Sequence, residues 1–251
     1  MGTLFPNGVS SMAICITDGV FKGLAPSVSV WQREMMNENI DIYDANLSHL
    51  GVMDRATAHK QGQWHLAFHC WIVNGIDDGS LLFQLRSRTS VNFASLLDAS
   101  AAGHLDAGER VGDGGVREIF EELGIEVELS SLHELGYRVE AMDESNGDKN
   151  REYQSVYLVR LDRPVSEYRP SPDEVDGLFW LPISSGFELF SGVMKEARVQ
   201  GIVYDHETRQ WYPNTRTVTL KDFIPRIQRY YLTVCIMAER LVRGQFPLAI
   251  S

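Results

Sequence analysis

The sequence is poor in cysteine, with only three in 251 residues. Cys15, Cys70 and Cys235 lie far apart and form neither a Cys-x-x-Cys pair nor the Cys/His spacing of a zinc site. An odd number of widely separated cysteines argues against a disulfide framework. We therefore expect reduced thiols, with Cys70 in the core because it lies in an apolar run.

Long apolar runs and basic clusters are absent as well. No stretch reaches the roughly 20 apolar residues of a membrane-spanning helix, and the N-terminus lacks a basic region followed by an apolar one. Lys and Arg total 23 against 34 Asp and Glu, a net charge of -11. A nucleic-acid-binding surface would be basic. These absences predict a cytoplasmic protein with neither a membrane nor a nucleic-acid partner.

The sequence pattern divides the chain into three parts. Residues 1–36 mix Gly, Ser and Pro with scattered apolar residues and are expected to form a poorly packed leader. A natural start at Met35 or Met36 is the alternative. Residues 37–183 carry regular strand patterns and are predicted to form the main domain. Residues 184–251 are predicted to be a C-terminal helical extension packed on the same domain.

Apolar runs bounded by turn residues predict the strands of the main domain. The predicted strands are 40–43, 50–52, 65–73, 81–85, 132–139, 153–161 and 175–181. Asp77-Asp78-Gly79 is a hairpin signal between two of them. Strands flanking helices in this order predict an α/β fold, an α/β/α sandwich with a mixed sheet.

The C-terminal extension is predicted to begin with an amphipathic helix that runs to about Gln200. A hairpin of 202–204 with 211–218 should follow, and then a closing helix from Thr219 through Arg243. We expect this helix to pack on its own domain, with a homodimer contact or a lid over the site as alternatives. Its predicted apolar face consists of Phe223, Ile227, Tyr231, Val234 and Ala238.

The most informative stretch is 103–125, GHLDAGERVGDGGVREIFEELGI. Glu118, Glu121 and Glu122 fall at i, i+3 and i+4, so on a helix their carboxylates project from one side. Like charges so close repel, and a divalent cation with substrate phosphate oxygens would offset them. Gly124 should end the helix. The opposite edge carries an apolar stripe suited to packing on a sheet: Val116, Ile119, Phe120 and Leu123.

Gly114 and Gly115 do not suit this helix. Each costs roughly 1 kcal/mol in a helix interior. We therefore expect the helix to start late or to be locally soft.

The same stretch matches the pattern G-x5-E-x7-R-E-U-x-E-E-x-G-U, with U aliphatic, at every fixed position. It resembles the Nudix box of the Nudix hydrolases. A solvated acidic helix is the alternative, but it does not require the two glycines and the arginine in register. The resemblance implies a Nudix fold over 37–183, a small-molecule diphosphate substrate and Mg²⁺ or Mn²⁺ as cofactor. It also implies metal ligation by Glu118, Glu121 and Glu122 with the backbone near Gly103, orientation of these carboxylates by Arg117, and a bond from Glu109 across the loop.

A second resemblance covers roughly His59 to Pro182. HLAFHCW from His65, the hairpin leading to Arg88, and LLDASAAGH before the box resemble the Nudix branch that contains type I isopentenyl-diphosphate isomerase and its hydrolase-like relatives. Those isomerases bind a metal through three histidines and two glutamates, and the positions that match here are His59, His65, His104 and Glu152.

Two positions depart from the isomerase pattern. Asn150 stands where the second glutamate is expected, and Ala102 replaces the catalytic cysteine. Allyl isomerisation needs a proton donor and an acceptor on opposite faces of the substrate, and alanine can be neither. The residues therefore favour hydrolysis over isomerisation.

Several candidates keep two interpretations. His65 is a metal ligand or a hydrogen-bonded core residue, and His104 contacts a metal, a phosphate or neither. Arg86 and Arg88 end a strand, where alternation sends both to one face. They could clamp phosphates or form a solvated strand end. Trp64, Tyr153 and Tyr157 could stack on a substrate or simply belong to the core.

The predicted chemistry is attack of water on a diphosphate, with Glu122, Glu174 or Glu152 as general base. We expect a metal-dependent hydrolase of a nucleoside-diphosphate derivative or another organic diphosphate. An isomerase-like activity is one alternative. A non-catalytic ligand-sensing module is another, which the intact acidic triplet disfavours. The motif leaves open which diphosphate is the substrate, because selectivity lies in loops outside it.

Overall fold

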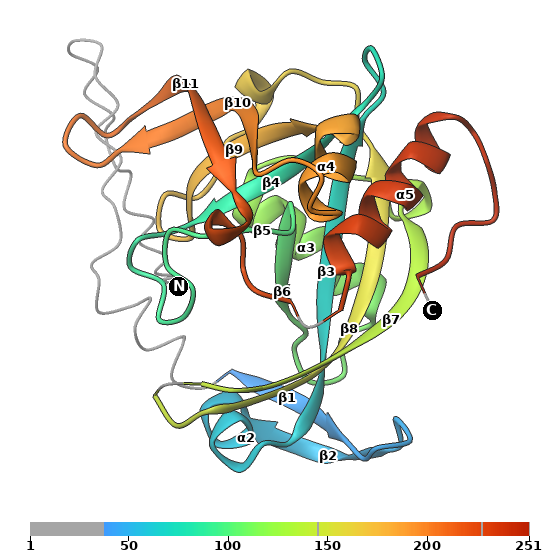
Figure 1. The fold of residues 1–251 in the computed structure, drawn as a ribbon. Helices are drawn as coiled ribbons and strands as arrows, with labels where there is room; N and C mark the ends of the chain where they lie inside the picture. Colours follow the sequence, from blue (N-terminus) through green and yellow to red (C-terminus); the bar gives the residue numbers. More distant parts are fainter. Residues whose placement is uncertain (1–37, 145, 227, 251) are drawn as a thin grey trace, which may run out of the picture. The chain divides into compact units, whose positions relative to one another are not determined.

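The computed structural model describes residues 38–144, 146–226 and 228–250. Within these ranges eleven strands form one sheet with helices on both faces (Figure 1). The predicted leader over 1–36 and Cys15 lie outside the described residues.

Strand β3 (Trp64–Asn74) is the centre of the sheet. It pairs antiparallel with β1 (Asn39–Tyr43), β4 (Ser80–Arg86) and β6 (Ala101–His104). Its pairing with β8 (Lys149–Arg160) is parallel. The combination makes the sheet mixed, as predicted.

The remaining strands extend the sheet from these partners. The order along the main path is β11-β10-β9-β4-β3-β1-β2, and β5 pairs with β4 and β7 with β8. Their bounds are β2 His49–Asp54, β5 Leu97–Asp98, β7 His133–Asp143, β9 Val175–Pro182, β10 Glu196–Asp205 and β11 Gln210–Thr219.

The two faces of the sheet are covered by different helices, as Figure 1 shows. On one face, Ile119 and Leu123 of α3 join Phe68 of β3 in an apolar cluster. On the other, residues of α4 and α5 surround Trp71 of β3. The predicted α/β/α sandwich is therefore present. The helices span α2 Arg55–Gln61, α3 Val111–Leu123, α4 Ile183–Phe190 and α5 Tyr230–Val242, with short 3-10 turns η2 Leu129–Ser131, η3 Val165–Glu167 and η4 Leu220–Asp222.

Alternation along β3 assigns its side chains to these faces. Phe68 and Cys70 belong to the α3 cluster, whereas Trp71 and Val73 belong to the α5 cluster. Because successive side chains point to opposite faces, His65 points to the α5 side of the sheet. Cys70 is fully buried, as expected.

Helix α3 does not start late. It begins at Val111 and includes both of its suspect glycines, which are buried. A Cβ on Gly115 would lie 2.2 Å from the Phe68 ring, and one on Gly114 would lie 2.6 Å from Leu105. These glycines let the first turns approach the sheet closely, and that packing offsets their poor helix propensity.

The helix predicted from 184 to about Gln200 is wrong in length. Helix α4 ends at Phe190, Gly192 follows with φ +80°, and β10 begins at Glu196. Ala197 and Val199 are buried on one side of β10 and alternate with exposed neighbours, the period of a strand. The predicted hairpin is confirmed and is longer than expected, pairing Glu196–Asp205 with Gln210–Thr219.

The closing helix is shorter than predicted. Helix α5 begins at Tyr230, because the segment before it is held to the sheet by tertiary bonds, including Ile224 N to Leu97 O at 3.0 Å. Phe223 is buried ahead of the helix, and Ile227 lies outside the described residues. Tyr231, Val234 and Ala238 form the buried face as expected.

The short helix α2 was not predicted. The Asp54 carboxylate caps it by accepting from Thr57 N at 3.0 Å, and Gly62 ends it with φ +68°. Its importance is that it carries His59 toward β3.

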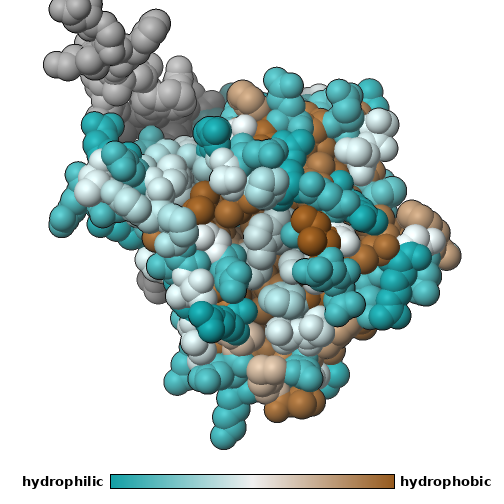
Figure 2. Space-filling view, turned by 90° about the horizontal axis from the view of Figure 1, so that it is seen from above, coloured by the Kyte–Doolittle hydropathy of each residue, from teal (hydrophilic) through white to brown (hydrophobic). Residues whose placement is uncertain are grey.

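The described residues contain no helix that is both long and apolar enough to cross a membrane. On the face in Figure 2, hydrophobic residues form small patches separated by polar ones.

Candidate functional site

Helix α3 places the three box glutamates on one side, as the spacing predicts, but at different depths. The Glu122 residue is buried, at 6% exposure. The Glu118 side chain is 13% exposed and that of Glu121 is 49% exposed. The two deeper carboxylates face strand β6, and Glu121 lies toward solvent.

Backbone and side-chain donors fix the Glu122 carboxylate. Its Oε2 accepts from Ala102 N at 2.9 Å and from Gln84 Nε2 at 3.3 Å. Among the described strands β6 pairs with β3 alone, so the outward N–H of Ala102 is free to donate to the helix. Sheet topology thus orients one carboxylate of the triplet.

The lack of a side chain at Gly103 leaves room for the Glu118 carboxylate. A Cβ on residue 103 would lie 2.1 Å from the Glu118 Cδ, well inside contact distance. Only glycine lets the β6 backbone approach the carboxylate this closely. Gly103, expected to assist through its backbone, therefore lies beside a predicted metal ligand.

Arg117 connects the loop to the triplet. Its Nε and Nη2 donate to the Glu109 carboxylate at 3.0 and 2.9 Å, a bidentate pair. Its Nη1 donates to Glu118 at 3.0 Å and to Glu121 at 2.8 Å. Its Nη2 also donates to the His104 carbonyl at 3.1 Å. One guanidinium thus contacts three glutamates and the strand.

The electrostatics of this group call for a cation. Burial, with added repulsion from Glu121, raises the pKa of Glu118 to about 7, although Arg117 opposes the shift. Burial, with repulsion from Glu118, also raises the pKa of Glu122 well above its usual range. A divalent cation between the two carboxylates would favour their charged forms.

Glu174 and Arg86 lie near these carboxylates. Glu174 is exposed, precedes β9, and its charge adds to the repulsion at both Glu118 and Glu122. Arg86 is half-buried at the end of β4, where its charge acts on Glu122 and its Nε donates to Asn92 O at 3.3 Å.

Arg88 lies beyond the strand that carries Arg86. Strand β4 ends at Arg86, so alternation does not extend to Arg88, which is exposed. The Arg88 N–H donates to Asp176 Oδ2 at 2.8 Å, because the chain turns toward the loop before β9. The expectation that Arg88 belongs to the strand was wrong, and the expected phosphate contacts of the two arginines stay a prediction.

A second group, the histidine cluster, consists of His59, His65 and His104. One ligand atom from each lies within 4.8 Å of the others. The ring centroids of His65 and His104 are 5.2 Å apart, and those of His59 and His65 are 4.9 Å apart. Helix α2, β3 and β6 contribute one histidine each, so the cluster depends on the fold.

The polar atoms of this cluster fit a metal. The Nε2 atoms of all three histidines are buried and make no hydrogen bond within the described residues. Buried polar atoms are normally paired. Burial lowers the pKa of His59 to about 4 and holds that of His104 well below its usual range, which keeps both rings neutral and able to bind a cation.

Glu152 lies next to the histidine cluster. Its Oε1 lies 3.9 Å from His65 Nε2 and 3.7 Å from His104 Nε2, while its Oε2 accepts from Gln154 Nε2 at 2.6 Å. Asn150, two residues earlier on β8, has a buried Oδ1 without a partner in the described chain.

The two groups adjoin across β6. Gly103 points to α3 and Glu118, whereas the His104 ring belongs to the histidine cluster. The His104 carbonyl accepts from Arg117 of the first group. A substitution in β6 should therefore affect both the glutamate group and the histidine cluster.

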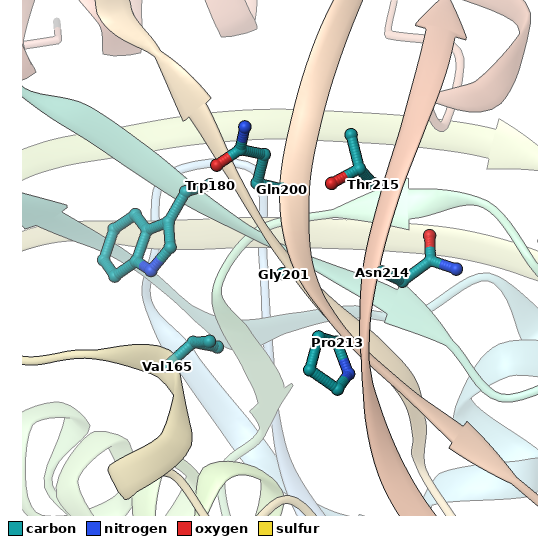
Figure 3. A pocket seen from close by; sticks show the side chains of 7 residues that line it. All are labelled: Val165, Trp180, Gln200, Gly201, Pro213, Asn214 and Thr215. Atoms are coloured by element: carbon teal, nitrogen blue, oxygen red, sulfur yellow. The ribbon is translucent and has the colours of Figure 1, made fainter.

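Other candidates lie elsewhere. Trp64 stacks on Tyr153 at 4.8 Å between centroids, and Tyr157 packs beside Phe68 at 5.3 Å, which is the core interpretation. A hollow of about 370 Å³ crosses β9 to β11, and Figure 3 shows the side chains around it. None of the predicted site residues is among those that line it: Val165, Trp180, Gln200, Gly201, Pro213, Asn214 and Thr215.

Sequence reasoning missed a buried polar chain beside the histidine cluster. Arg138, Glu140 and Gln154 are buried, and so is Asp98. Arg226 joins them from the segment before α5. A signal existed, because polar residues at the inward positions of predicted strands are costly unless they serve a purpose.

Comparison with known proteins agrees with this geometry. The family profile described as NUDIX domain matches residues 63–198. A protein of Clostridium acetobutylicum named as an uncharacterized Nudix hydrolase is 31% identical over 203 residues, covering 80% of this chain and 96% of its own.

An isopentenyl-diphosphate Delta-isomerase of Cutibacterium acnes is 29% identical over 155 residues, covering 59% of this chain and 75% of its own. A crystal structure from Deinococcus radiodurans aligns at 20% identity with a TM-score of 0.45, covering 62% of this chain and 90% of that one.

Proposed function

This chain belongs to the Nudix family, and from that premise we propose that it is a divalent-metal-dependent hydrolase that cleaves a diphosphate linkage in a small organic molecule. The observation that carries the proposal is the convergence of two carboxylates with raised pKa values on the β6 backbone, Glu118 beside Gly103 and Glu122 on the N–H of Ala102. Such a group is unfavourable when charged and empty, and favourable around a cation.

The oxygen donors favour Mg²⁺ or Mn²⁺, since both prefer carboxylate and carbonyl ligands. Glu118, Glu121 and Glu122 would hold the ion, with the Gly103 carbonyl beside them. When bound, the ion would supply positive charge to the phosphate oxygens in the transition state. Arg117 would keep the carboxylates in place through its bonds to Glu118 and Glu121.

The general base is assigned to Glu174. Glu122 accepts hydrogen bonds from Ala102 and Gln84. Glu152 lies next to the histidine cluster. Glu174 is an exposed residue, and no hydrogen bond to its carboxylate occurs within the described residues. Partial burial, with repulsion from Glu121, raises the pKa of this carboxyl. It is thus available to take a proton from an attacking water.

Arg86 would hold a substrate phosphate. It is the arginine whose charge acts on both Glu122 and Glu174, and its guanidinium suits phosphate geometry. Arg88, which is exposed beyond the strand, has no comparable support.

The histidine cluster with Glu152 would hold a second cation. Three imidazole nitrogens and one carboxylate form a softer donor set than the box glutamates and suit Zn²⁺, Mn²⁺ or Co²⁺ better than Mg²⁺. The support is the three orphaned Nε2 atoms.

Isomerase-like activity is the alternative that the relatives suggest. It is disfavoured because Ala102, opposite His69 in the β3–β6 register, offers no acid or base. Charged groups lie near His69, namely Asp98 and Arg226, and they do not suit a hydrocarbon tail.

The test is a substrate panel on the full-length protein with Mg²⁺ or Mn²⁺. Nucleoside diphosphates linked to sugars, dinucleoside polyphosphates and isoprenyl diphosphates would be compared by phosphate release after coupling to phosphatase. Cleavage of at least one diphosphate, abolished by EDTA and restored by metal, is expected. No cleavage in the panel, together with no stabilisation by metal, would overturn the proposal.

A further inference from the structure

A continuous chain of buried hydrogen bonds links the C-terminal segment to Glu152. It starts where Arg226 Nη2 donates to Asp98 Oδ1 at 2.6 Å, and Arg226 Nη1 donates to Glu140 Oε2 at 2.7 Å. Arg138 Nη1 donates to the same Glu140 oxygen and also to Gln154 Oε1. Gln154 Nε2 then donates to Glu152 Oε2 at 2.6 Å.

All of these groups are removed from water. The side chains of Arg226 and Asp98 are 7% and 5% exposed, and those of Arg138 and Glu140 are 4% and 2% exposed. Burying charges is costly, and well-packed apolar residues often stabilise a fold as well or better. Stability alone therefore explains this series of buried hydrogen bonds poorly. A role at the neighbouring histidine cluster is the better explanation.

Tyr230 holds the arginines in place. The Arg138 guanidinium lies 4.6 Å from the Tyr230 ring centroid, and that of Arg226 lies 6.0 Å away. The Tyr230 hydroxyl in turn accepts from Trp71 Nε1 at 2.9 Å. Aromatic contacts of this kind favour one orientation of a guanidinium. The first residue of α5 thus fixes the segment that carries Arg226.

The chain determines how Glu152 is oriented. With its Oε2 bound to Gln154, Glu152 turns Oε1 toward His65 and His104. The amide of Gln154 has one allowed direction, since its oxygen accepts from Arg138 and its nitrogen donates to Glu152. If Arg226 were absent, Glu140 would lose its second partner and draw Arg138 away from Gln154.

We propose that Arg226 is a positioning residue for the cation held by the histidine cluster, acting through Glu140, Arg138 and Gln154 to orient Glu152. This inference rests on the proposed second cation of that cluster. It makes residues of the C-terminal extension part of the site: without Arg226 the orientation of one ligand is no longer set. Groups that hydrogen-bond to a metal ligand and orient it typically change metal affinity by about 10- to 100-fold.

Co²⁺ is the probe, because its visible absorption reports the ligands that bind it. The full-length chain carrying Glu122→Gln, which weakens the box site, serves as the background. Titration should give a histidine-type spectrum that His59→Ala removes. Adding Arg226→Met should weaken Co²⁺ binding by about 10- to 100-fold and change the band intensities. Arg226→Lys, which keeps the charge but not the fork, should lie between the two.

Two controls keep the test decisive. Arg243→Met removes an exposed arginine of the same extension, paired with Glu239 on the surface, and should leave Co²⁺ binding unchanged. Gln154→Leu breaks the series of hydrogen bonds next to Glu152 while the Arg226 ion pairs stay in place. It should therefore reproduce the loss of Co²⁺ affinity even if Arg226→Met fails to fold.

The outcomes separate the two proposals. Wild-type affinity and spectrum in folded Arg226→Met, or in Gln154→Leu, would overturn the positioning role and leave the cation site standing. Absence of histidine-type Co²⁺ binding in the background protein would overturn both.

Discussion

Gly103 and Glu118 are in such close contact that a methyl group on residue 103 would lie 2.1 Å from the Glu118 Cδ. The strand backbone and the carboxylate of a helix therefore share one small space. The obstacle would be the end of a flexible side chain, so a larger residue at 103 would displace the carboxylate before it displaced the fold.

Gly103→Ala should weaken metal binding more than it weakens folding. We expect the Mg²⁺ concentration for half-maximal thermal stabilisation to rise, and turnover to fall by about 10- to 100-fold. Gly115→Ala is the contrast, because it presses on Phe68 in the core and should lower the melting temperature without changing that Mg²⁺ concentration. Wild-type Mg²⁺ response and turnover in Gly103→Ala would rule this account out.

Arg117→Lys should lower turnover by about 10- to 100-fold, with a smaller effect on KM. Lysine lacks the planar fork and cannot pair bidentately with Glu109 while also contacting Glu118 and Glu121. Steady-state kinetics measure the effect. Arg110→Lys, at an 83% exposed side chain on the same loop, should behave as wild type. Equal kinetics for the two variants would count against the orienting role of Arg117.

Stability without metal should fall as pH rises. The pKa of Glu118 is about 7 in the fold against 4.5 ordinarily, so between these values the folded state binds more protons than the unfolded state. The free energy of unfolding should then decrease over this window, by up to about 3 kcal/mol from Glu118. Burial raises the pKa of Glu122 in the same direction.

Urea denaturation in EDTA at pH 5 and pH 8 measures this effect. Glu118→Gln removes one of the two titrating groups and should reduce the difference between the two pH values. Mg²⁺ should restore stability at pH 8 by mass action. A difference between the two pH values that is the same in wild type and Glu118→Gln would contradict the pKa assignment.

Much of the fold could be predicted from local pattern. Strand β3 and helix α3 follow from continuous or periodic apolar residues, and the glutamate triplet lies on one side because its spacing requires it. Segments whose conformation depends on distant partners could not. Residues 223–226 are not helical because Ile224 bonds to Leu97 and Arg226 pairs with Asp98 and Glu140, which outweighs the helical pattern.

The same distinction between local pattern and distant partners applies to the site. The box gave residues that are neighbours in sequence, but the distance from His59 to His104 depends on α2, a helix set by the Asp54 cap and Gly62. The two ends of the buried hydrogen-bond chain, Glu152 and Arg226, are 74 positions apart in sequence. Only the sheet register, such as Arg138 opposite Gln154, brings such residues together.

The wild-type protein should not isomerise isopentenyl diphosphate to dimethylallyl diphosphate, because Ala102 supplies neither acid nor base. Ala102→Cys alone should not create an efficient isomerase, since Asn150 still lacks the charge of a glutamate ligand. NMR of the products after incubation with metal checks both. Interconversion of the two isoprenoid diphosphates by the wild type would move the function to the isomerase class.

The most direct test of the central claim is the turnover of Glu122→Gln with Mg²⁺ on the best substrate of the panel. The glutamine can still accept from Ala102 N, so the fold should hold and metal-free stability should not fall, while loss of the ligand charge should reduce kcat by at least about 100-fold. Glu126→Gln, at an exposed position just beyond α3, should keep full turnover. A folded Glu122→Gln variant that turns over as fast as wild type would contradict the account.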